Sequence, residues 1–140
     1  MQTQQGRLFI GRFKDGGDLL AELTGLCKKE GIRLGVFSVI GALTGAKLGY
    51  YKQDEKKYTD CVSLDKKLEI ASCTGNISLL NSEIFVHAHI VLADHSGKTY
   101  GGHLMPGATI FAAEYYVREL KGTPLERTRD PETGLNLWKI

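Results

Sequence analysis

Three of the four histidines stand where a β-hairpin could bring their side chains together. His87 and His89 are two residues apart in the apolar segment EIFVHAHIVLA, which is typical of a β-strand. Side chains alternate between the two faces of a strand, so both imidazoles point the same way. His103 lies in the segment TYGGHLM, which returns after the turn-forming residues DHSG. The spacing therefore predicts three imidazoles on one face of a hairpin.

Two registers of this hairpin satisfy the prediction. A turn centred on Ser96 places His103 directly across from His89, and a turn centred on His95 places it across from His87. A half-step register or a bulge before His103 would separate the rings. Directly opposed Cβ atoms lie about 4.5–5.5 Å apart, which allows imidazoles at such positions to converge on one metal ion.

Three neutral imidazoles suit zinc or another first-row divalent metal. Three protein ligands leave a fourth coordination position for water or substrate, which is the arrangement of catalytic rather than structural zinc sites. Such a metal lowers the pKa of a bound water or polarises a carbonyl group. The competing interpretation is that the histidines are ordinary residues of the hairpin.

Two glutamates are candidate catalytic residues beside these predicted metal ligands. Glu69 and Glu114 lie in the apolar, strand-like stretches LEIASCT and TIFAAEYYVREL. Either could act as a general base, as a hydrogen-bond partner of a histidine or as a further metal ligand. The sequence favours a surface role for both. His95 belongs to the turn, where we expect it to be exposed to solvent.

A small charged cluster near the end of the chain is the other candidate for binding. Arg127, Arg129 and Asp130 precede a turn and could bind an anion. The sequence favours a structural ion-pair network or a subunit contact for them.

The elements that must position these residues are mostly strands. One helix is predicted after the N-cap Asp18, because apolar residues recur at helical spacing up to Gly31, a natural C-terminal cap. A glycine-rich bend is predicted over residues 41–49, and at most one further helix. The remaining pattern predicts strands over residues 7–13, 33–40, 58–64, 68–74, 77–80, 84–93, 99–105, 109–120 and 135–138, and a strand that follows the bend and ends at residues 50–51. The sum is an α+β, sandwich-like domain.

Composition limits the classes of protein to be considered. The chain has 140 residues, 42% of them hydrophobic and 24% charged, which fits one globular domain over residues 1–140 with a core at about 7–138. Its formal net charge of +2 is too balanced for a protein whose main partner is the phosphate backbone. Three cysteines without C-x-x-C spacing predict small buried residues rather than a zinc-thiolate site. No signal-peptide or membrane-spanning segment occurs, so we expect a cytoplasmic protein without membrane contact.

Four segments in order, IGALTGAKLGYY, LEIASCTGNIS, FVHAHIVLADHSGKTYGGHLMPG and AAEYYVREL, resemble the plants-and-prokaryotes-conserved (PPC) domain. The resemblance covers residues 7–138, and the H-x-H…GGHL combination is its most specific part. It implies an antiparallel or mixed sheet with flanking helices and assembly as a homotrimer. It also implies a zinc site at His87, His89 and His103. The family's fold is similar to that of acetolactate decarboxylase, a zinc lyase with a histidine-based site.

The favoured hypothesis is a small homotrimeric zinc-binding protein, with a small-molecule ligand at the open position and lyase or hydrolase chemistry as the natural use of the site. Whether it is an enzyme is left open. The alternative is a DNA-binding or protein-interaction module of the PPC type without catalysis. The chain lacks the Arg-Gly-Arg-Pro core of the AT-hooks that precede the plant domain. In a third hypothesis, the metal only stiffens a structural trimer.

Overall fold

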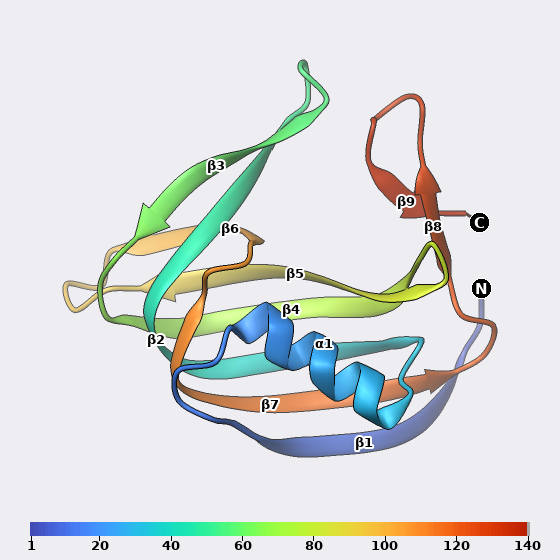
Figure 1. Cartoon of the computed structure of the whole chain (residues 1–140), viewed down its shortest axis with the longest axis horizontal. Helices are drawn as coiled ribbons and strands as arrows, with labels where there is room; N and C mark the ends of the chain where they lie inside the picture. Colours follow the sequence, from blue (N-terminus) through green and yellow to red (C-terminus); the bar gives the residue numbers. More distant parts are fainter. Residues whose placement is uncertain (140) are drawn as a thin grey trace.

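Nine strands hydrogen-bond into one sheet, with one helix against its inner side (Figure 1). The computed structural model describes residues 1–139, without the side chains of residues 60 and 61. Within that part of the chain the elements are β1 (Gln4–Phe13), α1 (Leu19–Glu30), β2 (Gly35–Lys52), β3 (Lys57–Leu64), β4 (Leu68–Leu80), β5 (Glu83–Ala93), β6 (Thr99–Leu104), β7 (Thr109–Lys121), β8 (Glu126–Arg129) and β9 (Asn136–Trp138).

The long strand β2 organises the sheet. Its first half lies between β7 and β4, and its second half pairs with β3 and, over two residues, with β6. All pairings are antiparallel except that of β4 with β8, so the sheet is mixed. The predicted antiparallel or mixed sheet is confirmed. The flanking helices implied by the resemblance are represented in the described residues by α1 alone.

Helix α1 begins and ends as the sequence predicts. The Asp18 carboxylate accepts the backbone N–H of Ala21 at 2.9 Å, and Gly31 ends the helix in the left-handed region at φ 68°. The same carboxylate accepts the N–H groups of Gly107 and Ala108 at 2.6 and 3.1 Å. The helix start is thereby tied to the loop between β6 and β7. The residues that α1 buries against the sheet are Leu19, Leu23 and Cys27.

Two predicted interruptions of strands are wrong. The glycine-rich residues 41–49 lie inside β2, and β4 continues through Gly75. Register shifts around Val39 and Leu43 show that β2 bends by bulges while it keeps its partners. Gly75 lies where the Phe37 ring packs over the strand, so the absence of a side chain serves packing rather than a turn. The sequence pattern also missed β8.

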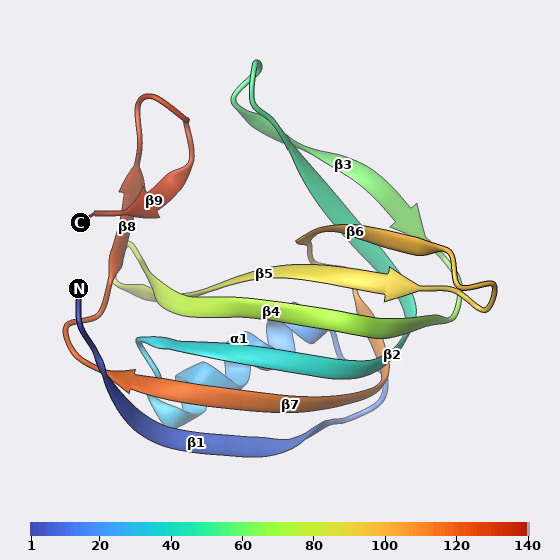
Figure 2. The ribbon, with the colours of Figure 1, turned by 180° about the vertical axis from the view of Figure 1, so that it is seen from behind.

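The sheet presents two different faces. Its inner face packs against α1 and holds the core, which includes Val39, Cys73, Ile90 and Val117. Its outer face has no helix over it, and Figure 2 shows α1 behind the sheet. Cys27 and Cys73 are buried and free, as predicted, whereas the side chain of Cys61 lies outside the described part. No helix in residues 1–139 is long and apolar enough to span a membrane.

We expect Gly75→Ala to destabilise the protein by more than about 2 kcal/mol, because an added methyl group would overlap its neighbours. Its Cβ would lie 2.5 Å from Cζ of Phe37 and closer still to the backbone carbonyl oxygen of His87. The measurement is the free energy of unfolding from urea titration. Gly25→Ala is the matched control, since a Cβ there meets nothing within 4 Å and alanine favours the helix by about 1 kcal/mol. Equal stability of the two variants would contradict this account.

Candidate metal centre

The three histidines lie on neighbouring positions of the sheet. The β5–β6 register pairs His89 directly with His103, which confirms the first of the two predicted registers. The β4–β5 register pairs His87 with Asn76. Ala88, between the two histidines of β5, is only 2% exposed and faces the core. Because neighbours along a strand point to opposite faces, the imidazoles occupy the outer face of the sheet.

The imidazoles form a compact cluster. The ring centroid of His87 lies 5.2 Å from that of His89 and 5.0 Å from that of His103, and the centroids of His89 and His103 are 5.5 Å apart. One ring nitrogen from each residue lies within 4.8 Å of the others. His87 and His103 are half-buried, whereas His89 is exposed. The cluster is therefore enclosed on one side and open to solvent on the other.

Two nitrogens of this cluster are buried without a hydrogen-bond partner among the side chains that the structure describes. They are Nε2 of His87 and Nδ1 of His103. A buried polar atom that lacks a partner costs free energy, and metal ligation would satisfy both nitrogens at once. Burial, together with the neighbouring His103, Arg127 and His89, lowers the pKa of His87 to about 4. Burial also lowers the pKa of His103. Burial therefore favours the neutral form of His87 and His103, which a metal ligand requires, and the donor set fits zinc or a similar metal.

Aromatic and apolar side chains line a small cavity beside the cluster. The Tyr58 ring lies 4.8 Å from that of His103, and Phe85 points to the same face as His87 because it is two residues before it. The cavity has a volume of about 110 Å³. Its lining consists of Tyr58, Phe85, His87, His103, Arg127 and residues 135–137. Alternation along β5 could have indicated Phe85, but no local signal marked Tyr58.

Two hairpins stand over this part of the sheet. The β2–β3 hairpin and the β8–β9 hairpin both rise above β5 (Figure 1), and hydrogen bonds join their tips. The Tyr51 hydroxyl donates to the carbonyl of Thr133 at 2.6 Å, and Nζ of Lys56 donates to that of Pro131 at 3.2 Å. These contacts connect segments that are far apart in the sequence, so only the folded chain creates the cavity.

The other predicted site residues lie away from the cluster. Glu69 is exposed and pairs with Ala93, four residues along β5 from His89, which corresponds to about 13 Å. Glu114 is exposed on β7, three strands from β5, or about 14 Å. The structure brings neither carboxylate into the cluster, and their catalytic roles stay predictions. His95 is exposed in the turn, as predicted.

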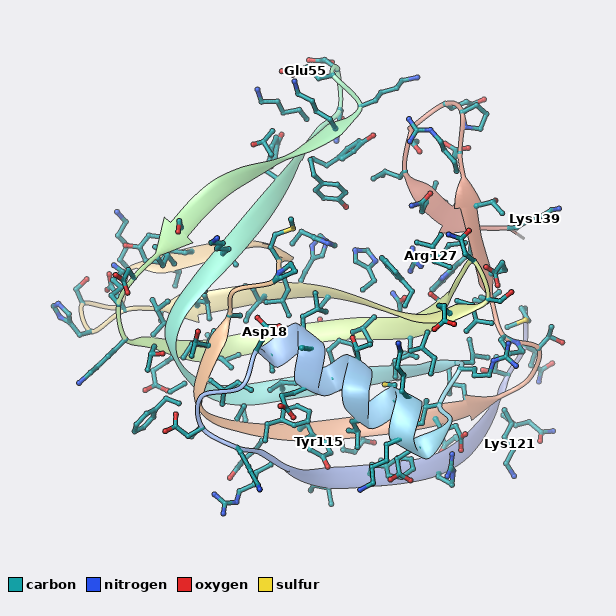
Figure 3. The ribbon with its side chains drawn as sticks, viewed as in Figure 1. Asp18, Glu55, Tyr115, Lys121, Arg127 and Lys139 are labelled. Atoms are coloured by element: carbon teal, nitrogen blue, oxygen red, sulfur yellow. The ribbon has the colours of Figure 1, made fainter. Side chains whose placement is uncertain are left out.

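The predicted charged cluster near the C-terminus is divided by the fold. Asp130 accepts hydrogen bonds from the backbone N–H and the hydroxyl of Thr133, and Arg129 is exposed. Arg127 is only 7% exposed and lies beneath the β8–β9 hairpin (Figure 3), where it lines the cavity. The expected ion-pair network is not found among the described residues. Arg127 instead donates to Ser78, Asn76 and the carbonyl of Asn136, while the Asp130 carboxylate accepts from Thr133 in the turn.

Comparison with known families identifies the chain. The model of the Plants and Prokaryotes Conserved (PCC) domain, also written PPC, matches residues 1–121. The chain belongs to the PCC domain family. The resemblance found in the sequence is therefore confirmed. The match includes all three histidines of the cluster and ends before Arg127.

Solved structures of PCC relatives share the fold throughout. A metal-containing protein from Archaeoglobus fulgidus is 38% identical, with a TM-score of 0.94 over 99% of this chain and 97% of the other. A plant- and prokaryote-conserved protein from Pyrococcus horikoshii is 37% identical, with a TM-score of 0.93 over 99% and 95%. A protein from Bacteroides thetaiotaomicron, whose name gives DNA binding as a provisional function, is 27% identical. Its TM-score is 0.86 over 98% of this chain and 96% of the other.

The PCC domain also resembles part of a longer protein. The chain is 32% identical over 136 residues to the bifunctional protein GlmU of Synechococcus sp. strain JA-3-3Ab. The match covers 96% of this chain and 20% of the relative, so the chain spans about a fifth of that protein.

The metal-free PCC domain should lose stability in mild acid. Because folding lowers the pKa of His87 from 6.5 to about 4, the unfolded chain binds more protons between these pH values. The free energy of unfolding should therefore fall as the pH is lowered from 6.5 to 5. Urea titrations across this range measure it. The decline should be smaller in His87→Gln and unchanged in His95→Gln, and a pH-independent wild type would refute the assignment.

Proposed function

We propose that this protein is a homotrimeric metal-binding protein that holds zinc, or another first-row divalent metal, through His87, His89 and His103. The observation that carries the proposal is the pair of buried, unpartnered imidazole nitrogens within one three-histidine cluster. Further support comes from the Archaeoglobus fulgidus relative, which is named as a metal-containing protein. Three imidazoles leave one coordination position for a small-molecule ligand.

A metal held in this way would polarise a carbonyl group or lower the pKa of a water molecule. The chain's own residues limit what reaches that position. Tyr58 and Phe85 line the cavity with aromatic surface, and its small volume admits only a small compound. The exposed side of His89 leaves an approach from solvent. Lyase or hydrolase chemistry on a small carbonyl compound is the use that this arrangement supports best.

The homotrimer is supported by the outer face of β1, β7 and β2. Exposed large apolar residues gather there: Leu8 at 58%, Ile10 at 83%, Val36 at 42% and Ile40 at 54% exposed. Leu8 and Val36 both pair with Arg118, Ile10 pairs with Tyr116, and Ile40 pairs with Glu114. Because these three β7 residues are two apart along the strand, the four apolar residues lie on the same face. A hollow of about 570 Å³ lies on this face beside Ile10 and Ile40. Association with further copies of the chain would remove this apolar surface from water.

DNA binding is the second candidate, because relatives from Bacteroides thetaiotaomicron and Ralstonia eutropha carry provisional names of that kind. The balanced charge of the chain gives this candidate less support. Under either candidate we place the protein in the cytoplasm, a proposal supported by the free thiols of Cys27 and Cys73.

We expect about one zinc or other first-row metal ion per chain in protein purified without a histidine tag or chelator. The His87→Ala, His89→Ala double variant and His103→Ala should lose most of it, and His95→Ala should retain it. Mass spectrometry measures the metal, and circular dichroism checks the fold. Full metal content in folded triad variants would overturn the site. If wild type stays metal-free after reloading, DNA binding with a steep salt dependence becomes the favoured function.

The homotrimer predicts a mass in solution three times the 15.4 kDa of the chain. Ile10→Lys should lower that mass to a single chain, because a buried lysine without a partner disfavours the interface. Tyr50→Lys is the control, since Tyr50 is 59% exposed on the β2–β3 hairpin. Multi-angle light scattering at micromolar concentration is the measurement. A monomeric wild type would contradict the assembly.

A further inference from the structure

The Arg127 guanidinium is a rigidly held positive charge beside the histidine cluster. Its Nε donates to Oγ of Ser78 at 2.8 Å, one terminal nitrogen donates to Oδ1 of Asn76 at 2.8 Å, and the other donates to the carbonyl of Asn136 at 2.9 Å. Asn76 is the residue that pairs directly with His87 across β4 and β5. The hydrogen bonds therefore fix Arg127 next to the metal-ligand candidate His87.

The described partners of Arg127 do not neutralise its charge. The three acceptors are a hydroxyl, an amide oxygen and a backbone carbonyl, all of them neutral. A guanidinium group has five N–H donors, so two donors have no acceptor recorded among residues 1–139 once the undescribed side chains of residues 60 and 61 are set aside. The ion pairs of the described side chains involve other residues.

The surroundings of Arg127 make this charge costly to hold. The guanidinium carbon lies 5.2 Å from the ring centroid of Phe85 and 5.4 Å from that of Trp138, and the residue is 7% exposed. Removing a cation from water is unfavourable unless it is paired, and two aromatic rings compensate only in part. An anion that reached the two remaining donors would gain a strong, charge-assisted interaction.

The cavity connects this cation with the imidazoles. Arg127, His87 and His103 all line it, and its volume is about 110 Å³. At about 30 Å³ for each water molecule, that is room for roughly four water-sized groups. The fork of a guanidinium matches the two oxygens of a carboxylate, which are coplanar and similarly spaced. A molecule of a few heavy atoms could meet Arg127 and the histidine cluster simultaneously.

We propose that the ligand of this site is a small carboxylate, bound through its carboxylate group by Arg127 while its remainder faces His87 and His103. This inference rests on the proposed metal site, because it names the class of compound that the open position accepts. It makes Arg127 a specificity-determining residue. Arg127 lines the cavity from the β8–β9 hairpin, which lies outside residues 1–121 matched by the family model.

Acetate and its neutral isostere acetamide are the matched probes. Trp138 is the sole tryptophan and lies against Arg127, so its fluorescence reports occupancy of the cavity. The full-length, metal-loaded protein is titrated with each probe at constant ionic strength. We expect saturable binding of acetate and at least about tenfold weaker binding of acetamide. Arg127→Gln should weaken acetate binding by at least about tenfold, whereas Arg129→Gln, which removes a charge two residues away, should change it less than twofold.

The outcomes separate this inference from the metal site. Metal retained in Arg127→Gln together with lost preference for acetate supports the inference. If metal is retained but the wild type binds both probes equally, or Arg127→Gln keeps the wild-type preference for acetate, the inference is overturned and the metal site stays intact. If the wild type binds no metal, the same titration of the metal-free protein decides: Arg127-dependent acetate binding supports the anion site, and its absence overturns it. Should Arg127→Gln not fold, Arg127→Lys and the wild-type comparison of the two probes serve instead.

Discussion

Strand β5 is hydrogen-bonded on both edges, to β4 and to β6, and this double pairing fixes which of its side chains face the core. Val86, Ala88 and Ile90 are at most 7% exposed and pack on the inner face. A shift by one residue would expose them and bury His87 and His89. The hydrophobic core therefore holds the register, and the register in turn places the imidazoles. The chemistry of the outer face depends on packing on the inner face.

The same register extends the outer face across the central strands β1, β7, β2, β4, β5 and β6. One row of directly paired residues runs from Ile10 through Tyr116, Ser38 and Thr74 to His89 and His103. Apolar positions occupy one end of this face and imidazoles the other. A single surface thus carries both the features that favour assembly and the candidate metal centre, because each of these strands contributes alternate residues to it.

The candidate metal centre is enclosed by two hairpins that lie outside this surface. The β2–β3 and β8–β9 hairpins contribute Tyr58 and Arg127, and the hydrogen bonds from Tyr51 and Lys56 hold the hairpins together. They turn part of an open sheet into a cavity, and burial there lowers the pKa of both His87 and His103. The cost of burying polar atoms and a cation is the physical basis of the proposal that this region binds a ligand.

Several local features of this domain are encoded in short stretches of the sequence. The period-2 alternation of β5, the turn before β6 and the caps of α1 are encoded by adjacent residues, and they were enough to predict three imidazoles on one face. The sequence could not predict that β2 and β4 run through their glycines, because bulges and close packing against Phe37 are set by neighbouring strands. Nor could the sequence predict that Arg127 lies beside His87, or that Glu69 and Glu114 lie away from the histidines. Those placements depend on pairings between distant segments, whose register is decided by burial of the shared core and leaves no local pattern in the sequence.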